Sequence, residues 1–264
     1  MFNSPEIQSL IDRQIVTIST HDNIMVHNIF FVAKQNGDQR LIINLKRLNK
    51  YLRPIKFRML TMSQFSRTLS QGDWFTKCDI EDAYYHVQIL PPFQHYFAFY
   101  YNNKTYCFTR LPFGLSSGPF LFTSLLRPVI AAFRNQGIGI HAYLDDFIIL
   151  SPNQTRALQD IHKVVSGLQV LGFRINFKKS ELIPRNHIVF LGLLWGSVPP
   201  SVTLPTEKWL KLRLRITNFI SAQPQTCKKL AQSLRLINFI SLHGLPSLRR
   251  RVRDIQLALI DARR

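Results

Sequence analysis

The 264-residue sequence has few cysteines, few acidic residues and no long apolar run. Its three cysteines (Cys78, Cys107 and Cys227) are widely spaced and form no CxxC pair. This spacing argues against a disulfide framework or a structural zinc site and favours a reducing compartment. No apolar run approaches the roughly 20 residues that span a bilayer, and the segment MFNSPEIQSL lacks the pattern of a secretory signal. We therefore expect an intracellular location and no membrane partner.

Acidic residues are so scarce that the charge balance is strongly positive. The sequence has 34 Lys and Arg against 15 Asp and Glu, a formal net charge of +19. Such an excess favours a polyanionic partner, either nucleic acid or an anionic membrane surface; a plain surplus of solubilising charge is the alternative. The apolar fraction of 46% and the charged fraction of 19% indicate a folded chain with one large domain or two to three subdomains.

The first half of the chain has strand and hairpin patterns. The segment IFFVAKQNGDQRLIINL predicts two strands around a turn at Asn36-Gly37. The segment GDWFTKCDI predicts a short strand that ends at Asp79, and YFAFYYNNKTYCFT predicts a hairpin that turns at Asn102-Asn103. These patterns indicate sheets built from local hairpins.

Helical and strand patterns then alternate. A helix capped by Ser116 or Ser117 is expected to end at Gly137, with a bend at Pro128. The segment HAYLDDFIIL predicts a hairpin with an acidic pair at its tip, and FRINFKKSEL and HIVFLGLLWG are interpreted as strands. A helix closed by Gly172 is expected between HAYLDDFIIL and FRINFKKSEL, with one apolar face formed by Leu158, Ile161, Val165 and Leu168. Together these segments predict an α+β region with helices on a mixed sheet.

From about Thr206 the pattern is wholly helical, with three apolar stripes. Pro224 and the segment Gly244-Leu245-Pro246 separate them, so we expect a small three-helix unit. Its last helix carries four arginines that are candidates for nucleic-acid binding: Arg249, Arg250, Arg251 and Arg253. A solvated charged face and a membrane-surface helix are the alternatives.

Three carboxylates point to phosphoryl chemistry. Asp79 ends a predicted strand, and Asp145 and Asp146 follow at a turn 66 positions later (145 − 79). If the two strands are neighbours, each like-charge pair at ~4 Å costs about 4 kcal/mol at an effective dielectric constant near 20. No basic residue lies close in sequence to the pair. Two Mg²⁺ ions about 3.5–4 Å apart would compensate these charges and favour nucleotidyl transfer. Ordinary turn chemistry at Asp145-Asp146 is the alternative.

Several segments also resemble the sequence boxes of reverse transcriptases, in the family's order. They are YLDD, FTKCDIEDAYYHV, LPFGLSSGPFLF, RLIINLKRLN, LGFRINFKKSEL and VFLGLLWG. Each box is weak alone, but together they cover about residues 20–264. The chain most resembles enzymes of DIRS-type retrotransposons, followed by gypsy-type elements and pararetroviruses.

The resemblance implies a role for each matching residue. Asp79 and Asp145 would hold two Mg²⁺ ions (Mn²⁺ is a possible substitute) with help from the Ile80 carbonyl, and Asp146 would support them. Lys179 would donate a proton to pyrophosphate, and Tyr84 would be the steric gate under the sugar. The remaining nucleotide-binding residues would be Lys34, Arg40, Asp82, Ala83, Phe113 and Gly114, and the primer grip would be Phe190, Leu191 and Gly192. Surface charge for Lys34 and Lys179, and core packing for Tyr84 and Phe113, are the alternatives.

The resemblance also implies a right-hand polymerase fold with fingers, palm and a helical thumb. The expected boundaries are fingers 1–73, palm 74–90, fingers 91–117, palm 118–204 and thumb 205–264. The partners would be dNTPs and an RNA template with a DNA primer, or an RNA–DNA duplex. The cytoplasm, the nucleus and a retroelement particle are all compatible locations.

Two positions depart from the retroviral pattern, and two other functions stay open. Phe113 stands where retroviral enzymes have a glutamine, which puts a polar nucleotide contact there in doubt. Asn44 replaces an aspartate of the retroviral fingers. An RNA-dependent RNA polymerase is disfavoured by the aromatic Tyr84. A catalytically silent nucleic-acid-binding scaffold is disfavoured because all three carboxylates are present.

Overall fold

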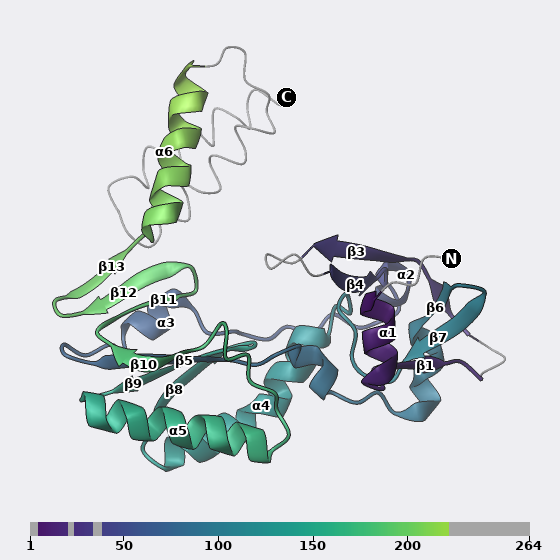
Figure 1. Cartoon of the computed structure of the whole chain (residues 1–264), viewed down its shortest axis with the longest axis horizontal. Coiled ribbons are helices and arrows are strands. Elements are labelled where there is room, and N and C mark those ends of the chain that lie inside the picture. The colour runs from purple at the N-terminus through teal and green to yellow at the C-terminus, as the bar shows by residue number, and fades with distance from the viewer. Residues whose placement is uncertain (1–4, 21–23, 34–38, 222–264) are drawn as a thin grey trace. The chain divides into compact units, whose positions relative to one another are not determined.

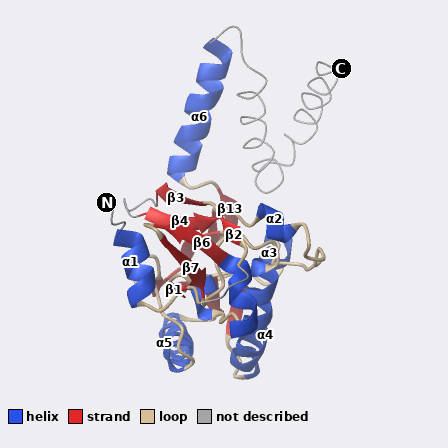
Figure 2. Cartoon of the chain, turned by 90° about the vertical axis from the view of Figure 1, so that its right-hand side faces the viewer, coloured by secondary structure: helices blue, strands red, loops and turns tan. Residues whose placement is uncertain are grey.

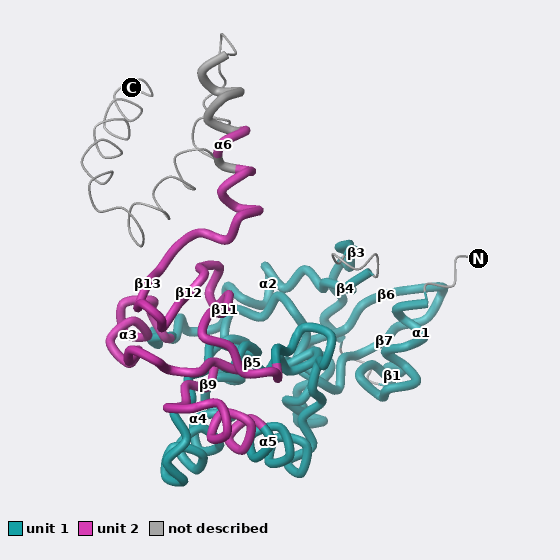
Figure 3. The backbone as a smooth tube through the Cα atoms, turned by 60° about the vertical axis from the view of Figure 1, so that its left-hand side comes forward, with its two compact units in different colours: residues 1–59, 77–147, 162–181 teal, residues 60–76, 148–161, 182–264 magenta. Residues whose placement is uncertain are grey.

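The computed structural model describes residues 5–20, 24–33 and 39–221, except for the side chains of 212 and 215–221. The described chain forms two compact units (Figure 3). Unit 1 comprises Met1–Met59, Lys77–Phe147 and His162–Glu181, and unit 2 comprises Leu60–Thr76, Ile148–Ile161 and Leu182–Arg264.

The N-terminal part of unit 1 is built from small sheets and short helices (Figures 1 and 2). One sheet has the strand order β1-β7-β6-β2, and β3 and β4 form a separate antiparallel hairpin. The elements are α1 (Pro5–Asp12), β1 (Val16–Ile18), β2 (Val26–His27), β3 (Ile29–Ala33), β4 (Gln39–Ile43), α2 (Lys46–Asn49), η1 (Ala83–His86), η2 (Pro91–Phe97), β6 (Ala98–Tyr101) and β7 (Lys104–Phe108).

The hairpin predictions for this region are confirmed in the described residues. β6 and β7 pair from Ala98↔Cys107 to Tyr101↔Lys104. Asn102 and Asn103 both have positive φ, 45° and 58°, which is the requirement of the tight turn that matches strand twist. β3 and β4 pair from Ile29↔Ile43 to Ala33↔Gln39, while their expected turn at Asn36-Gly37 lies outside the described residues.

Aromatic side chains dominate the core of this region. Phe99 and Phe108 are fully buried, with ring centroids 5.5 Å apart, and Tyr85 stacks on Phe108 at 6.5 Å. Burial of one such ring contributes about 1.5–3 kcal/mol to folding. Because Tyr85 lies in the short helix η1, this core also fixes the chain that follows Asp79.

A second four-stranded sheet, of order β10-β5-β9-β8, holds the strands that carry the carboxylates. The strands are β5 (Trp74–Asp79), β8 (Gly139–Tyr143), β9 (Asp146–Ser151) and β10 (Glu181–Arg185). Since β5 and β9 are hydrogen-bonded neighbours, the prediction that these two strands lie side by side is confirmed. The accompanying helices are α4 (Gly118–Asn135), which contacts β8, and α5 (Gln154–Val170).

The structure corrects three local predictions. Leu158 is 50% exposed, and the buried face of α5 is instead formed by Ala157, Ile161, Val164 and Leu168. Ser117 lies at the N-cap of α4, but its side chain makes no capping hydrogen bond. Residues 173–180 of the predicted strand 173–182 are not part of a strand, and only its last two residues belong to β10. The backbone N–H groups of Lys179 and Ser180 donate to the Asn176 carbonyl, and the Lys179 N–H also donates to the Asn176 side-chain oxygen. These hydrogen bonds fold residues 177–179 into a turn before β10 begins.

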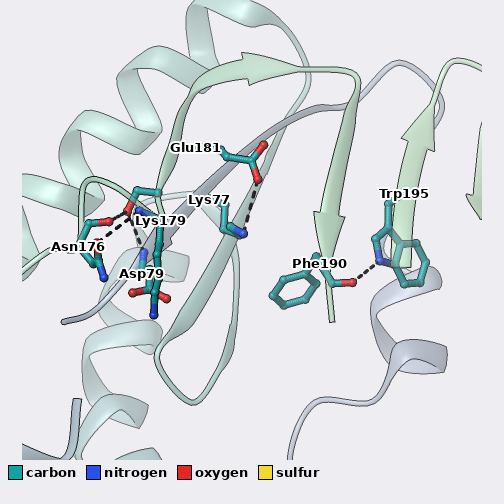
Figure 4. Close-up of polar contacts among 8 residues, drawn as sticks. Lys77, Asp79, Asn176, Lys179, Glu181, Phe190 and Trp195 are labelled. Carbon is teal, nitrogen blue, oxygen red and sulfur yellow. Dashed lines mark hydrogen bonds and ion pairs between the residues drawn. The ribbon is translucent and has the colours of Figure 1, made fainter. Parts of the chain in front are cut away.

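Unit 2 contains a three-stranded antiparallel sheet of order β11-β12-β13. Its core is Trp195, whose ring lies 4.8 Å from Phe65 and whose indole N–H donates to the Phe190 carbonyl at 2.9 Å (Figure 4). The elements are α3 (Met62–Ser66), β11 (His187–Phe190), β12 (Leu193–Ser197), β13 (Pro200–Thr203) and α6 (Thr206–Ser221).

The expected three-helix unit is described only in its first helix, α6. Its second and third stripes, with the four arginines, lie outside the described residues. Within the described part of the chain, no helix is long and apolar enough to cross a membrane.

Candidate active site

Asp79 lies at the end of β5 in a polar loop of unit 1 (Figure 4). Its backbone N–H donates to the Ser180 hydroxyl at 3.0 Å, and its carbonyl accepts the Asn176 N–H at 2.8 Å. The carboxylate itself is 5% exposed, and its Oδ1 atom has no hydrogen-bond partner. A buried carboxylate oxygen without a partner is costly, so this atom indicates a missing cationic or donor group.

The acidic pair lies beside Asp79. Leu144 and Asp145 form the tight turn between β8 and β9, with Leu144 at φ 54°. The Asp145 carbonyl accepts the Ile80 N–H at 3.0 Å. This bond joins the residue after Asp79 to the acidic turn, and Asp146 begins β9 directly afterwards.

The carboxylates perturb one another. The pKa of Asp79 is raised from 3.8 to about 6, mainly by burial and also by the charges of Asp145 and Asp146, while Lys179 and Lys77 oppose this rise. Burial also raises the pKa of Asp146, with Asp145 contributing in the same direction. The three carboxylates therefore lie close enough to influence one another's pKa, and their joint role as cation ligands stays a prediction.

Two lysines that are distant in sequence from the Asp145-Asp146 pair influence this cluster. Lys77 precedes Asp79 by two residues on β5, and its ammonium lies 3.5 Å from the Glu181 carboxylate (Figure 4). Lys179 is the stronger cationic influence on Asp79. The pKa of Asp79 is nevertheless raised, so the two lysines only partly offset burial and like-charge repulsion.

The remaining deficit of positive charge fits a hard divalent cation. Among the described residues, no three His, Cys, Asp or Glu side chains form a closed metal-ligand group. Mg²⁺ in phosphoryl-transfer sites is commonly held by one or two carboxylates together with substrate phosphates rather than by an all-protein cage. The unpartnered Asp79 Oδ1 and the adjacent Asp145 fit that incomplete ligand set.

The segment after Asp79 makes a strained turn. Asp82 has φ 49° and ψ 46° at the start of η1, and its carboxylate accepts a 2.9 Å ion-pair hydrogen bond from Arg13. A left-handed conformation at a non-glycine residue costs on the order of 1 kcal/mol or more and persists where surrounding contacts fix it. The Arg13 contact is one such restraint, and Ala83 and Tyr84 follow in η1.

Tyr84 follows this turn and packs against two aromatic rings, those of Phe113 and Phe122. Its ring centroid is 5.1 Å from that of Phe113 and 5.9 Å from that of Phe122. Burial raises the pKa of Tyr84, and the nearby Asp145 charge raises it further. Tyr84 is therefore both half-buried and close to the acidic turn.

Arg40 contacts the Phe113 ring that packs against Tyr84. The Arg40 guanidinium carbon lies 4.4 Å from the centre of the Phe113 ring, in cation–π range. The buried Arg40 Nε has no hydrogen-bond partner. An arginine stacked in this way is held in place while its outer nitrogens remain able to contact an anion.

The backbone conformation at position 114 requires a glycine. Gly114 has φ 113°, and a Cβ built on it would lie 2.7 Å from the Ile43 carbonyl oxygen. Its own carbonyl accepts the Asn49 side-chain amide at 2.9 Å, and Asn49 also accepts the Ser116 N–H at 2.9 Å. The loop beside Phe113 is thus fixed against β4 through close backbone approach.

We expect Gly114→Ala to lower the free energy of unfolding by about 1–3 kcal/mol, because it adds overpacking to an unfavourable φ. Gly72→Ala is the matched control, since Gly72 has φ 87° but open space where its Cβ would stand. Urea unfolding of both variants measures the difference. Equal losses would show that the contact with Ile43 contributes nothing.

The structure thus places most of the candidate residues in unit 1. Those around the acidic turn are Asp79, Ile80, Asp82, Ala83, Tyr84, Asp145, Asp146 and Lys179. Those beside the Tyr84 ring are Arg40, Phe113 and Gly114. Lys34, Arg249, Arg250, Arg251 and Arg253 lie outside the described residues.

The predicted primer-grip residues belong to unit 2. Phe190 is 1% exposed and packs on Phe65 at 5.1 Å, so its side chain is part of the core. Leu191 and Gly192 form the turn to β12, with φ 50° and 78°, and the Gly192 carbonyl accepts the Lys208 ammonium at 2.8 Å. Leu191 and Gly192 are the members of this set that remain candidates for contact.

Sequence reasoning missed Arg13 and Lys77. Arg13 is 69 positions from Asp82, and no local pattern links the two. Lys77 could have been found, because alternate residues of a strand share a face and Asp79 lies two positions later.

The comparisons with known proteins agree with this geometry. Residues 32–194 match the family model described as reverse transcriptase (RNA-dependent DNA polymerase). The chain belongs to the reverse transcriptase family. Among curated members, a Pro-Pol polyprotein of simian foamy virus type 1 is 27% identical over 89% of this chain and 20% of its own length. The Protein P of duck hepatitis B virus (isolate brown Shanghai duck S5) is 31% identical over 72% and 25%.

Solved reverse transcriptases have the same fold. A foamy viral protease-reverse transcriptase in complex with double-stranded DNA matches with a TM-score of 0.81 and 23% identity, covering 96% of this chain and 43% of that one. The same kind of protein in complex with an RNA/DNA hybrid matches with a TM-score of 0.72 and 25% identity, over 90% and 31%. These matches confirm the predicted α+β polymerase fold.

The chain spans a fifth to a quarter of the length of these two curated relatives. A transposon Tf2-3 polyprotein of Schizosaccharomyces pombe is also similar, at 23% identity over 80% of this chain and 15% of its own length. Relatives thus include retroviral, pararetroviral and transposon proteins, and the DIRS-type assignment stays a prediction.

Proposed function

We propose that this chain is an RNA-directed DNA polymerase that extends a primer 3′-hydroxyl with dNTPs. The observation that carries the proposal is the hydrogen bond of the Ile80 N–H to the Asp145 carbonyl at 3.0 Å. It joins the two acidic segments of a reverse transcriptase family member, with Tyr84 close by.

The carboxylates are the binding site for divalent cations, which reverse transcriptases use. We propose that Asp79 and Asp145 hold two Mg²⁺ ions, with the Ile80 carbonyl as a further ligand and Asp146 in support. When bound, the ions supply charge neutralisation and Lewis-acid stabilisation of the attacking and leaving oxygens. Without them Asp79 remains partly protonated near pH 6, so ion binding and its deprotonation are coupled.

The neighbouring side chains bind and select the nucleotide. Arg40, fixed on Phe113, contacts the triphosphate, and the Asp82 and Ala83 backbone N–H groups complete that contact. Lys179, already close enough to influence Asp79, donates a proton to the leaving pyrophosphate. Tyr84 lies under the sugar and excludes a 2′-hydroxyl.

The nucleic-acid partner is an RNA template paired with a DNA primer. Foamy viral relatives have been solved with double-stranded DNA and with an RNA/DNA hybrid, and the net charge of +19 favours a polyanion. The fingers (1–73 and 91–117), palm (74–90 and 118–204) and thumb (205–264) are the corresponding regions of this proposal.

Primer extension tests the proposal directly. A labelled DNA primer on an RNA template should be extended by dNTPs in the presence of Mg²⁺, and a chelator should abolish extension. Parallel reactions with rNTPs and with a DNA template define substrate preference. Duplex binding without any extension in Mg²⁺ or Mn²⁺ would indicate a silent scaffold, and a preference for rNTPs would indicate an RNA polymerase.

A further inference from the structure

A second cavity in unit 1 combines cations with an apolar wall. Its volume is about 590 Å³, within the range of pockets that bind small organic ligands. Three arginines line it, Arg13, Arg110 and Arg174, and none of the residues that line it is one of the acidic-site residues Asp79, Asp145 or Asp146. The cavity is therefore distinct from the proposed polymerase site.

The cationic side of the cavity has a deficit of negative charge. Arg13 is paired with Asp82 at 2.9 Å. The Arg110 and Arg174 guanidinium groups have no ion-pair or side-chain hydrogen-bond partner among the residues that the structure describes. Two unpaired guanidinium groups at one cavity favour an anion, and their planar donors suit phosphate.

His86 adds a neutral surface between these cations. Its Nδ1 donates to the Ala83 carbonyl at 3.2 Å, and its Nε2 accepts the Arg174 backbone N–H at 3.1 Å. Burial lowers the pKa of His86, and the Arg110 and Arg13 charges act in the same direction, while the hydrogen bond to Ala83 and the Asp82 charge oppose it. The two hydrogen bonds hold the imidazole near Phe173, 5.2 Å away between ring centroids.

The remaining lining residues include several apolar side chains. Among them are Leu125, Pro128 and Val129 of α4 and Leu171. Leu125 is 43% exposed and Leu171 is 58% exposed, so this surface remains open to a ligand. An inorganic anion would make no contact with these apolar side chains, whereas a phosphate attached to a flat heterocycle can contact both the arginines and the apolar residues.

We propose that this cavity binds a nucleotide unit, with its phosphate on Arg110 and Arg174 and its base against the Leu125 wall. The unit comes either from a free nucleotide or from a single strand, since both present the same phosphate and base. The site goes beyond the proposed polymerase reaction and requires no divalent cation, primer or dNTP.

Calorimetric titration with AMP in a chelating buffer tests this site apart from polymerisation. Charged hydrogen bonds of this kind change affinity by roughly tenfold or more each. We expect the Arg110→Gln, Arg174→Gln double variant to bind AMP at least about tenfold more weakly. Arg127→Gln is the control, because Arg127 is an exposed arginine of α4, the helix that carries Leu125, and does not line the cavity. It should leave AMP binding unchanged.

The apolar wall is tested with Leu125→Ser. This variant should weaken AMP binding and leave inorganic phosphate binding unchanged. A four-residue adenylate strand that binds more tightly than AMP identifies a single strand as the source, and equal affinity identifies a free nucleotide. Circular dichroism and melting temperature establish that each variant is folded, and AMP should raise the melting temperature of the wild type.

Two results would overturn the proposal. The first is that the double arginine variant binds AMP with the same affinity as Arg127→Gln. AMP binding would then be a general effect of net charge. The second is an equal loss of AMP and phosphate binding in Leu125→Ser, or inorganic phosphate binding as tightly as AMP. A polymerase that is inactive in primer extension leaves this test unaffected.

Discussion

Asp79→Asn should remove primer extension while leaving duplex binding nearly intact. The substitution keeps the shape of the side chain and deletes the charge of the group whose Oδ1 is buried without a partner. Loss of one preorganised electrostatic contact costs about 10²–10³ in rate, and loss of a cation ligand should cost at least that. Single-nucleotide extension kinetics in Mg²⁺ measure the effect.

The matched control is Asp12→Asn, an exposed carboxylate of α1 in the same unit. It should extend primers like the wild type. Duplex binding of both variants, measured by fluorescence anisotropy, separates a catalytic loss from a binding loss. If Asp79→Asn extends primers within a fewfold of the wild-type rate, the carboxylate is not a cation ligand.

The same variant should be more stable than the wild type in the absence of cations. Because burial raises the folded-state pKa of Asp79 from 3.8 to about 6, the wild type loses stability as pH rises through about 6, and below pH 3.8 this loss is absent. The amide of Asn does not ionise, so the variant avoids that loss. At pH 8 in a chelator, urea unfolding should show a gain of at most about 3 kcal/mol.

Much of the acidic site could be predicted from local sequence. The pattern around HAYLDDFIIL predicts a hairpin, and a strand that ends at Asp79 is indicated by its apolar run. Their adjacency in the β10-β5-β9-β8 sheet required the family resemblance, because strand order in a mixed sheet is set by tertiary packing that no local pattern records.

The errors have local physical causes. Segment 173–182 contains alternating apolar residues, yet the Asn176 carbonyl accepts hydrogen bonds from the Lys179 and Ser180 backbone N–H groups. This turn replaces the expected strand up to residue 180, and only residues 181 and 182 are in β10. In α5 the predicted apolar face includes the large Leu158, which is exposed, while the buried face contains the smaller Ala157. Short side chains in a helix signal close packing as strongly as long ones do.

Contacts between distant segments could not be predicted at all. Arg13 and Asp82, 69 positions apart, are joined only because α1 and η1 pack on one aromatic core. The cation–π contact of Arg40 with Phe113 has the same origin. Such pairs determine how the site is held, and a single sequence contains no signal for them.

Tyr84 is the residue that we propose to exclude the 2′-hydroxyl of an rNTP. It follows the strained Asp82 turn, and its ring is held against Phe113 and Phe122. Its position near Asp145 places the ring beside the proposed reaction centre. A dNTP sugar fits over such a ring, whereas the 2′-hydroxyl of an rNTP collides with it.

Tyr84→Ala should therefore raise rNTP incorporation strongly while dNTP use declines modestly. Exclusion by overpacking commonly costs about 1–3 kcal/mol, which corresponds to roughly tenfold to more than a hundredfold in rate. Tyr84→Phe is the matched control, because it keeps the ring and should keep the wild-type selectivity. The measurement is kcat/KM for single-nucleotide extension with a dNTP and with the matching rNTP in all three proteins. A purely structural Tyr84 predicts lower stability and equal losses for both substrates, so an unchanged ratio in Tyr84→Ala would remove this residue from the nucleotide site. A wild type that already prefers rNTPs would instead overturn the assignment as a DNA polymerase.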